Sequence, residues 1–278
     1  MPPRRVWFIT GASSGFGFQL TKLVLTKGDV AVATARHLEP LNDLFLEYGH
    51  TNRLLVLKLD VTVEGDIRKV FEEVRKTYRR IDVVYNNAGL GGVGEVENTP
   101  NDFARETFET NFWGAAHVTR AAVKFFREVN SPRGGRLIQA SSMYGFAAGR
   151  GGYYSASKFA LEGLTEAVAQ EINPEWNIKI TLVEAGHFKT NISRHRGRIP
   201  AHPAYNHLAK RPSVADPVVN VGDPVKLCEA LYGLAGLGNP PLRLVLGNDA
   251  LELVKGKLAK VREEVDQYET WSADLKPE

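Results

Sequence analysis

The stretch VWFITGASSGFG (residues 6–17) decides the fold of this chain, because it joins a short apolar run to three closely spaced glycines. The run predicts a strand, and the helix-period apolar residues after Gly17 predict a helix. Between them, backbone N–H groups and the helix dipole suit a pyrophosphate, and glycine lacks the Cβ that would keep a phosphate away. An ordinary glycine-rich turn is the alternative. The residues predicted to contact the pyrophosphate are Gly11, Ser13, Ser14, Gly15, Phe16 and Gly17.

Short apolar runs alternate with helical patterns along most of the chain. Continuous apolar strands between helices are typical of a parallel sheet that is covered on both faces. The pattern predicts an α/β fold, a Rossmann-like doubly wound parallel sheet of about seven strands flanked by helices. No repeat or linker divides the chain, so we expect a single dinucleotide-binding and catalytic domain over residues 1–278. The runs lie at 6–9, 30–33, 54–57, 83–85, 137–140, 178–183 and 242–246.

The composition is that of an ordinary globular protein, with 43% hydrophobic residues, 24% charged residues and a net charge of +3. The small charge and the scattered basic residues argue against nucleic acid as a partner. Cys228 is the single cysteine and the seven histidines lack metal-ligand spacing, so we expect neither a disulfide nor a metal site. Since no apolar run suits a signal peptide or a membrane span, we expect a soluble, cytoplasmic protein that does not bind membranes.

Two regions interrupt the alternation. Residues Asn191 to about Gly222 are rich in proline, arginine and histidine and show little periodicity. Because irregular segments of that length in compact domains are often lids, we expect a substrate lid at about 191–222. The tail contains a helical pattern from Ala250 to about Gln267, followed by a polar segment with Trp271.

The end of the second predicted strand bears on the choice of nucleotide. An NAD site usually has Asp or Glu at this point to bind the ribose hydroxyls. Here the strand ends in Ala35-Arg36, and the next acid along the chain is Glu39. Arg36, helped by the Ser13 hydroxyl, would suit a 2′-phosphate, which favours NADP(H). A solvated arginine at the start of a helix is the alternative.

The next two strands also end in candidate residues. Asp60-Val61 follows the third strand and the turn Asn86-Asn87-Ala88-Gly89 follows the fourth. Ligands bind at the carboxyl ends of strands in open α/β sheets, so Asp60, Val61, Asn87, Ala88 and Gly89 are predicted to contact the cofactor. For Asp60, capping of the next helix explains the residue equally well.

The fifth strand leads to Ser141-Ser142, and Tyr154 and Lys158 follow four residues apart. On a helix, residues at that spacing share one face. A tyrosine is a poor acid or base at neutral pH, because its reference pKa is about 10. A nearby ammonium group favours the phenolate and lowers that pKa. A Tyr-x-x-x-Lys pair by itself is common on surface helices.

Taken in order, these motifs resemble the short-chain dehydrogenase/reductase family, in its single-domain NADP-preferring branch. The resemblance is strong from Arg5 to Thr190 and loose beyond. The stretch from Tyr154 to Gly163 looks like that of reductases that act on steroids, retinoids and related ketones. The motifs that carry the resemblance are Thr10–Gly17, Asp60, Asn86–Gly89, Asn111, Ser142, Tyr154 and Lys158.

The resemblance implies a role for each catalytic candidate. Tyr154 would exchange a proton with the substrate oxygen, and Ser142 would hydrogen-bond that oxygen. Lys158 would bind the nicotinamide ribose and lower the pKa of Tyr154. Asn111 would help to hold a water that connects Lys158 to solvent. By the same resemblance, Gly186, Phe188 and Thr190 would contact the nicotinamide end of the cofactor, together with Tyr154 and Lys158.

Two departures from the family pattern concern this site. Ser142 and Tyr154 are twelve residues apart, whereas a spacing of thirteen would point to Ser141. We prefer Ser142, because the family serine is followed by two residues and a glycine, as in Met143-Tyr144-Gly145. After the sixth strand, Ala185-Gly186 replaces the usual Pro-Gly, which would loosen the entry to the lid.

The implied function is an NADP(H)-dependent oxidoreductase that transfers a hydride between nicotinamide and a ketone, aldehyde or secondary alcohol. Alternatives are an epimerase or dehydratase of the same fold, and a non-catalytic NADP(H)-sensing regulator. We expect a small, moderately apolar substrate in a pocket lined by Gly92, Val93, Val96, Tyr144, Phe146 and Phe188. In this family, helices near 104–128 and 155–171 pair between subunits. We therefore expect a homodimer or homotetramer through Phe108, Trp113, Phe125, Phe159, Leu161 and Leu164.

Overall fold

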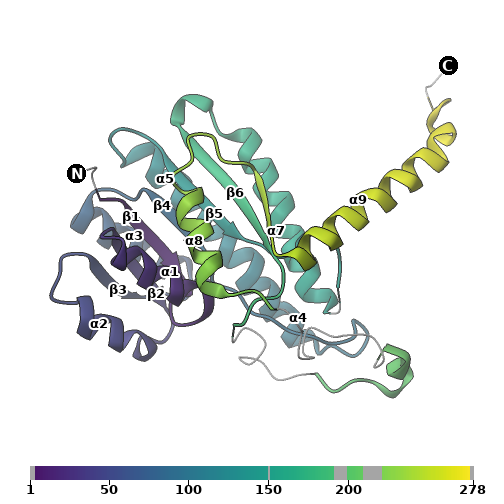
Figure 1. The fold of residues 1–278 in the computed structure, drawn as a ribbon, viewed down its shortest axis with the longest axis horizontal. Coiled ribbons are helices and arrows are strands. Elements are labelled where there is room, and N and C mark those ends of the chain that lie inside the picture. The colour runs from purple at the N-terminus through teal and green to yellow at the C-terminus, as the bar shows by residue number, and fades with distance from the viewer. Residues whose placement is uncertain (1–3, 150, 191–198, 209–220, 276–278) are drawn as a thin grey trace.

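A computed structural model describes residues 4–149, 151–190, 199–208 and 221–275, and in these ranges the strands form one parallel sheet (Figure 1). The strand order is β3-β2-β1-β4-β5-β6-β7, which confirms the predicted doubly wound fold of seven strands. The order reverses between β1 and β4, the switch point where ligands bind in such sheets. The strands are β1 (Val6–Thr10), β2 (Val30–Ala35), β3 (Leu54–Lys58), β4 (Val83–Asn86), β5 (Gly135–Ala140), β6 (Ile178–Ala185) and β7 (Arg243–Leu246).

Helices cover both faces of the sheet. Buried side chains of α1, α2 and α8 pack with one face, and those of α3, α5 and α7 pack with the other. Along β1, Trp7 and Ile9 belong to the first layer and Val6 and Phe8 to the second, which is why the run is apolar throughout. The helices are α1 (Gly15–Thr26), α2 (Asn42–Tyr48), α3 (Glu64–Tyr78), α4 (Asn101–Phe108), α5 (Ala115–Glu128), α6 (Met143–Phe146), α7 (Gly152–Glu171), α8 (Pro224–Leu234) and α9 (Asn248–Tyr268).

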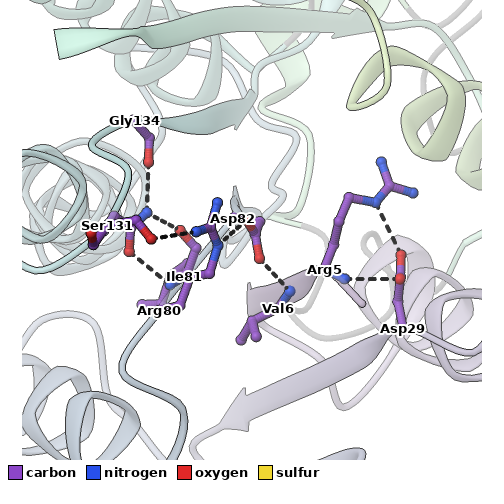
Figure 2. Close-up of polar contacts among 9 residues, drawn as sticks. Arg5, Val6, Asp29, Arg80, Ile81, Asp82, Ser131 and Gly134 are labelled. Carbon is purple, nitrogen blue, oxygen red and sulfur yellow. Dashed lines mark hydrogen bonds and ion pairs between the residues drawn. The ribbon is translucent and has the colours of Figure 1, made fainter. Parts of the chain in front are cut away.

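Hydrogen bonds tie together the amino end of the sheet (Figure 2). Asp29 accepts hydrogen bonds from the backbone N of Arg5 at 3.0 Å and from its Nε at 3.1 Å. Asp82 accepts from the backbone N of Val6 at 2.8 Å and from Nε of Arg80 at 2.5 Å. Because both carboxylates are used in hydrogen bonds that join neighbouring segments, we assign a structural role to the amino end of the sheet. The candidate residues for chemistry lie at the opposite end.

Part of the predicted lid lies outside the described residues, namely 191–198 and 209–220. The described part contains a short 3₁₀ helix, Pro203–Leu208. It is held to a neighbouring loop, because Asn98 Nδ2 donates to the carbonyl oxygen of Pro200 at 2.7 Å and the Tyr205 hydroxyl donates to Glu97 at 2.6 Å. A gating role for this segment stays a prediction.

The aromatic and aliphatic residues expected at a subunit interface differ in exposure, and two of them, Phe108 and Leu164, are half-buried. Phe125 and Leu161 are 4% and 1% exposed, so the expectation that they face another subunit is wrong. Phe125 packs in the layer between helices and sheet instead, against Phe71. Trp113 and Phe159 are 48% and 38% exposed and remain available for contact.

Candidate active site

The glycine-rich loop joins β1 to α1, as predicted, and its geometry requires glycine. Gly11 and Gly15 have φ angles of +65° and +54°, in the left-handed region that favours glycine. An ideal Cβ on Gly17 would lie 2.3 Å from the carbonyl oxygen of Gly11. Any side chain at position 17 would therefore force the loop away from the helix.

The amino end of α1 presents backbone N–H groups that could hold an anion. Its N-cap residue, Ser14, makes no side-chain cap hydrogen bond within the described structure. The first turn begins with Gly15, Phe16 and Gly17 and carries no acid. Because the first N–H groups of a helix lack intrahelical partners and carry partial positive charge, they fit a pyrophosphate. The half-buried Ser13 lies in the same loop.

Arg36 follows β2 with its side chain exposed. It lines a hollow of about 450 Å³ together with Asp60, Thr62, Glu106, Glu109 and Thr110. The sequence places no acid directly before Arg36, but the tertiary structure brings carboxylates from three other elements to the same hollow. Their negative charge lowers the attraction of the hollow for a phosphate. Arg36 and Ser13 are the residues from which any preference for a 2′-phosphate would have to come.

Asp60 and Val61 have local structural roles as well. The Oδ1 atom of Asp60 accepts hydrogen bonds from the backbone N of Thr62 at 3.0 Å and from its hydroxyl at 2.8 Å. This turn leads into α3. The role of Asp60 here is similar to helix capping, which was the alternative interpretation of this residue. The Val61 side chain is 5% exposed, and a Cβ on Gly114 would lie 2.6 Å from it. Val61 can therefore offer a cofactor its backbone and not its side chain.

The turn after β4 is locked to the glycine loop. The Thr10 hydroxyl accepts hydrogen bonds from the backbone N of Asn87 at 2.8 Å and of Ala88 at 2.9 Å. The Asn87 side chain donates back to the Thr10 carbonyl at 2.9 Å. A Cβ on Gly11 would lie 3.0 Å from Cα of Ala88. The two turns predicted to bind cofactor are thus in direct contact.

Asn111 lies in a π-helical turn (Glu109–Gly114) between α4 and α5, a local irregularity that is frequent at functional sites. Its side chain is fully buried. The Oδ1 atom accepts from the backbone N of Leu90 at 2.7 Å, and Nδ2 donates to the Leu90 carbonyl at 2.9 Å. A Cβ on Gly89 would lie 3.3 Å from Oδ1 of Asn111 and 3.8 Å from Nζ of Lys158. Gly89 therefore lies between the two side chains.

Tyr154 and Lys158 lie one turn apart on α7, with Nζ of Lys158 5.9 Å from the centroid of the Tyr154 ring. Nζ also donates to the carbonyl oxygen of Ala140 at 2.7 Å. Burial lowers the pKa of Lys158 to about 8. Burial raises the pKa of Tyr154, and a hydrogen bond with Ser142 opposes that change. Burial thus outweighs the influence of Ser142 on the phenol, and the lowering of the Tyr154 pKa by Lys158 stays a prediction.

The two adjacent serines after β5 point to different partners. The Ser142 hydroxyl accepts from the backbone N of Tyr144 at 3.2 Å and lies near enough to the Tyr154 phenol to oppose the rise in its pKa. The Ser141 hydroxyl instead donates to Oε1 of the buried Glu162 at 2.5 Å. Ser142 and not Ser141 thus acts on the Tyr154 phenol in this structure, and its role as the catalytic serine stays a prediction.

His187 and Asp249 meet beside this site, and the sequence reasoning missed both. Asp249 Oδ2 accepts from the backbone N and from Nδ1 of His187, each at 2.8 Å. Nε2 of His187 lies 3.3 Å from the Tyr144 hydroxyl. A Cβ on Gly186 would lie 2.1 Å from the Asp249 carboxylate, so glycine is required there. Since 62 residues separate His187 from Asp249, no local pattern could have linked them.

The loop after β6 closes over the glycine loop. The rings of Phe16 and Phe188 are in edge contact at 5.5 Å, and a Cβ on Gly15 would lie 3.7 Å from Cβ of Thr190.

Phe146, one of the residues predicted to line a substrate pocket, lies away from the other residues of that prediction. It lines a separate hollow with Arg243, whose guanidinium lies 5.2 Å from the Phe146 ring centroid. That prediction is wrong, because α6 turns Phe146 toward α9.

Within the described ranges, no helix has the length and hydrophobicity that a membrane span requires. In the same ranges, no group of three or more His, Cys, Asp or Glu side chains is placed to hold a metal ion.

Comparison with known proteins identifies the family. The family model for short chain dehydrogenases matches residues 5–199. An uncharacterized oxidoreductase of Schizosaccharomyces pombe is 37% identical over 93% of this chain and 87% of its own. The 3-ketodihydrosphingosine reductase of Bacteroides thetaiotaomicron is 32% identical over 87% and 88%, respectively. The crystal structure of a short-chain dehydrogenase from Streptomyces avermitilis is 35% identical, covers 99% of this chain and 100% of that one, and has a TM-score of 0.89. The chain therefore belongs to the short-chain dehydrogenase/reductase family of oxidoreductases.

Proposed function

We propose that this protein is an NADP(H)-dependent oxidoreductase that transfers a hydride between the nicotinamide and a ketone, aldehyde or secondary alcohol. The observation that carries the proposal is the meeting of Tyr154, Ser142 and Lys158 beside the glycine loop. Ser142 lies near the Tyr154 phenol and opposes the rise in its pKa, and Lys158 lies across Gly89 from the buried Asn111. The site thus offers a proton donor next to a second hydroxyl donor, which is what carbonyl reduction requires of the protein.

The glycine loop fits a dinucleotide, because a side chain at Gly17 would collide with its backbone and the amino end of α1 is free of carboxylates. Further contacts would come from Asp60, Asn87, Ala88 and Gly89. When bound, NADP(H) supplies or accepts the hydride. Arg36 supports a preference for NADP(H) over NAD(H), since its exposed guanidinium can bond a 2′-phosphate.

In reduction, the Tyr154 phenol donates its proton to the carbonyl oxygen while the Ser142 hydroxyl hydrogen-bonds the same oxygen. The raised pKa of Tyr154 keeps the phenol protonated at neutral pH, ready to act as the acid. Lys158, with its pKa lowered to about 8, can return a proton to the phenolate. Asn111 lies beside Lys158 and would help to hold the water through which that amine exchanges protons with solvent.

Two observations support a moderately apolar carbonyl substrate. Val96 is 58% exposed and packs close to Gly152 at the start of α7, and Tyr144 is half-buried beside His187. One relative is a 3-ketodihydrosphingosine reductase, a name that indicates reduction of a ketone.

We also propose that the protein forms a homodimer or homotetramer through the helices α4, α5 and α7. Exposed aromatic side chains on this surface support the proposal. Trp113 is 48% exposed and in edge contact with Phe112 at 4.7 Å, and Phe159 is 38% exposed. Closed symmetry is the rule for such assemblies.

The test is NADPH oxidation with a panel of ketones and aldehydes, comparing wild type with Tyr154→Phe. The adjacent half-buried Tyr153 provides a matched control, Tyr153→Phe, which should retain turnover. Stoichiometric oxidation of NADPH and reduction of the ketone would support the proposal. Turnover without net change in NADPH would favour an epimerase or dehydratase, and tight NADPH binding without turnover of any substrate would favour a regulator.

A further inference from the structure

The last helix, α9, carries an apolar stripe that the proposed function does not use. Apolar residues recur at alternating steps of three and four, which is the heptad pattern of helices that pair with other helices. Polar and charged residues occupy most of the other positions. The stripe consists of Leu251, Val254, Leu258, Val261, Val265 and Tyr268.

This stripe lies largely outside the body of the protein. In the described structure, burial along α9 is confined to Ala250 and Val254. Leu258, Val261 and Val265 are 53%, 43% and 62% exposed, and the second half of the helix projects away from the sheet (Figure 1). A free helical segment of fewer than about 12–15 residues is marginal in water. The projecting half therefore needs a surface against which to pack.

The stripe continues onto the body through a hollow of about 340 Å³ beside α7. Leu258 and Val261 line one side of it, and Phe146 and Phe159 line the other. Lys257 covers the edge, with Nζ 4.7 Å from the Phe159 ring centroid. The exposed apolar surface is thus a groove between α9 and α7 rather than a single row of side chains.

The charges along α9 are separated by sign. Residues 255–262 contain four lysines or arginines and no acid, whereas 263–274 contain five acids and no lysine or arginine. The sign changes between Arg262 and Glu263. The ion pairs within the helix, such as Lys260–Glu264 at 3.8 Å, are surface pairs that stabilise little. Two such helices side by side attract when antiparallel and repel when parallel.

We propose that α9 pairs antiparallel with α9 of a second copy of this chain along the stripe. Pairing centred at the change of sign places Leu258 of one copy opposite Tyr268 of the other, and Val261 opposite Val265. The basic half of each helix then faces the acidic half of the other. The second copy occupies the groove between α9 and α7, because the charge pattern of its α9 complements that of the first copy.

Disulfide trapping tests the orientation. The single native cysteine, Cys228, is buried, so disulfides would report introduced cysteines. Antiparallel pairing predicts that Lys255→Cys mixed with Glu269→Cys forms a mixed disulfide, whereas neither variant alone does. If each variant instead links to itself, pairing is parallel and the proposal is wrong.

Light scattering tests the stripe itself. The double variant Leu258→Glu with Val265→Glu should halve the mass of the wild-type assembly where α9 alone joins its two halves. In the background of the cysteine pair it should abolish the mixed disulfide, whatever other interfaces exist. The control, Ala259→Glu with Gln267→Glu, changes two positions outside the stripe and should keep the wild-type mass. An unchanged mass in the stripe variant, with no mixed disulfide in the trapping experiment, would overturn the proposal. So would a monomeric wild type that binds anionic lipid vesicles through α9.

Discussion

The adjacent serines 141 and 142 allow a test in which one substitution affects catalysis and the other affects stability. Ser142→Ala removes the hydroxyl that lies near the Tyr154 phenol and that we propose hydrogen-bonds the substrate oxygen. Loss of one donor to a developing oxyanion typically lowers kcat about 10²–10³-fold, roughly 2.7–4 kcal/mol of transition-state stabilisation. We expect a loss of that size in kcat. A smaller effect on folding should accompany it, because the hydroxyl also caps Tyr144 N at 3.2 Å.

Ser141→Ala should have the opposite profile. Its hydroxyl donates to Oε1 of Glu162 at 2.5 Å, and Glu162 is only 3% exposed. A hydrogen bond to a buried charged group is worth about 1.5–3 kcal/mol. Arg243 still bonds the other oxygen of Glu162 at 2.5 Å, so the carboxylate keeps one partner. The variant should therefore unfold more easily by about 1.5–3 kcal/mol, with kcat within a few-fold of wild type.

The two measurements are steady-state kinetics with a ketone that the wild type reduces, and chemical denaturation without substrate. The reasoning is refuted if Ser141→Ala abolishes turnover while Ser142→Ala does not. In that case the spacing of thirteen residues to Tyr154 would define the catalytic serine.

Other expected outcomes concern the acid, the cofactor and the buried amine. Tyr154→Phe should lower kcat by roughly 10²–10⁴-fold with little change in cofactor affinity by fluorescence titration, because the phenol acts on the substrate. Wild type should prefer NADPH to NADH by about tenfold to a hundredfold in kcat/KM, and Ala35→Asp with Arg36→Leu should reverse the preference. The Lys158 pKa is lowered to about 8, and an unfolded lysine titrates near 10.4. The unfolded chain therefore binds more protons between these values, so the free energy of unfolding should rise with pH there, by up to roughly 3 kcal/mol. Denaturation of Lys158→Met should lack that rise.

Each of these expectations has a result that contradicts it. Near-normal turnover by Tyr154→Phe would remove the phenol from the chemistry. Equal use of both cofactors by the wild type would make Arg36 a solvated residue at a helix start. Parallel stability profiles of wild type and Lys158→Met between pH 8 and 10 would mean that the amine is not desolvated.

Much of the fold could be predicted because the signals are local. Each strand is a run of apolar residues bounded by polar ones, and helix periodicity fills the intervals, so the order of elements could be read directly. The glycine loop could be placed because the positive φ angles at Gly11 and Gly15 favour glycine, which is visible in the sequence. Local patterns failed for Phe125 and Leu161, because an apolar side chain on a helix packs equally well against a sheet or another subunit.

In the candidate site too, some features follow from the sequence and others only from the tertiary structure. The sequence by itself determined which side chains could carry chemistry, since Tyr154, Lys158 and Ser142 stand at spacings that a helix and a strand end convert into proximity. Only the tertiary structure distinguished the surroundings of Ser141 from those of Ser142, because the difference depends on Glu162 reaching Ser141 from α7. It also brought Asp249 to His187 and placed carboxylates in the hollow beside Arg36. The physical reason is that burial and charge depend on every element packed around a group, whereas sequence spacing reports the element to which it belongs.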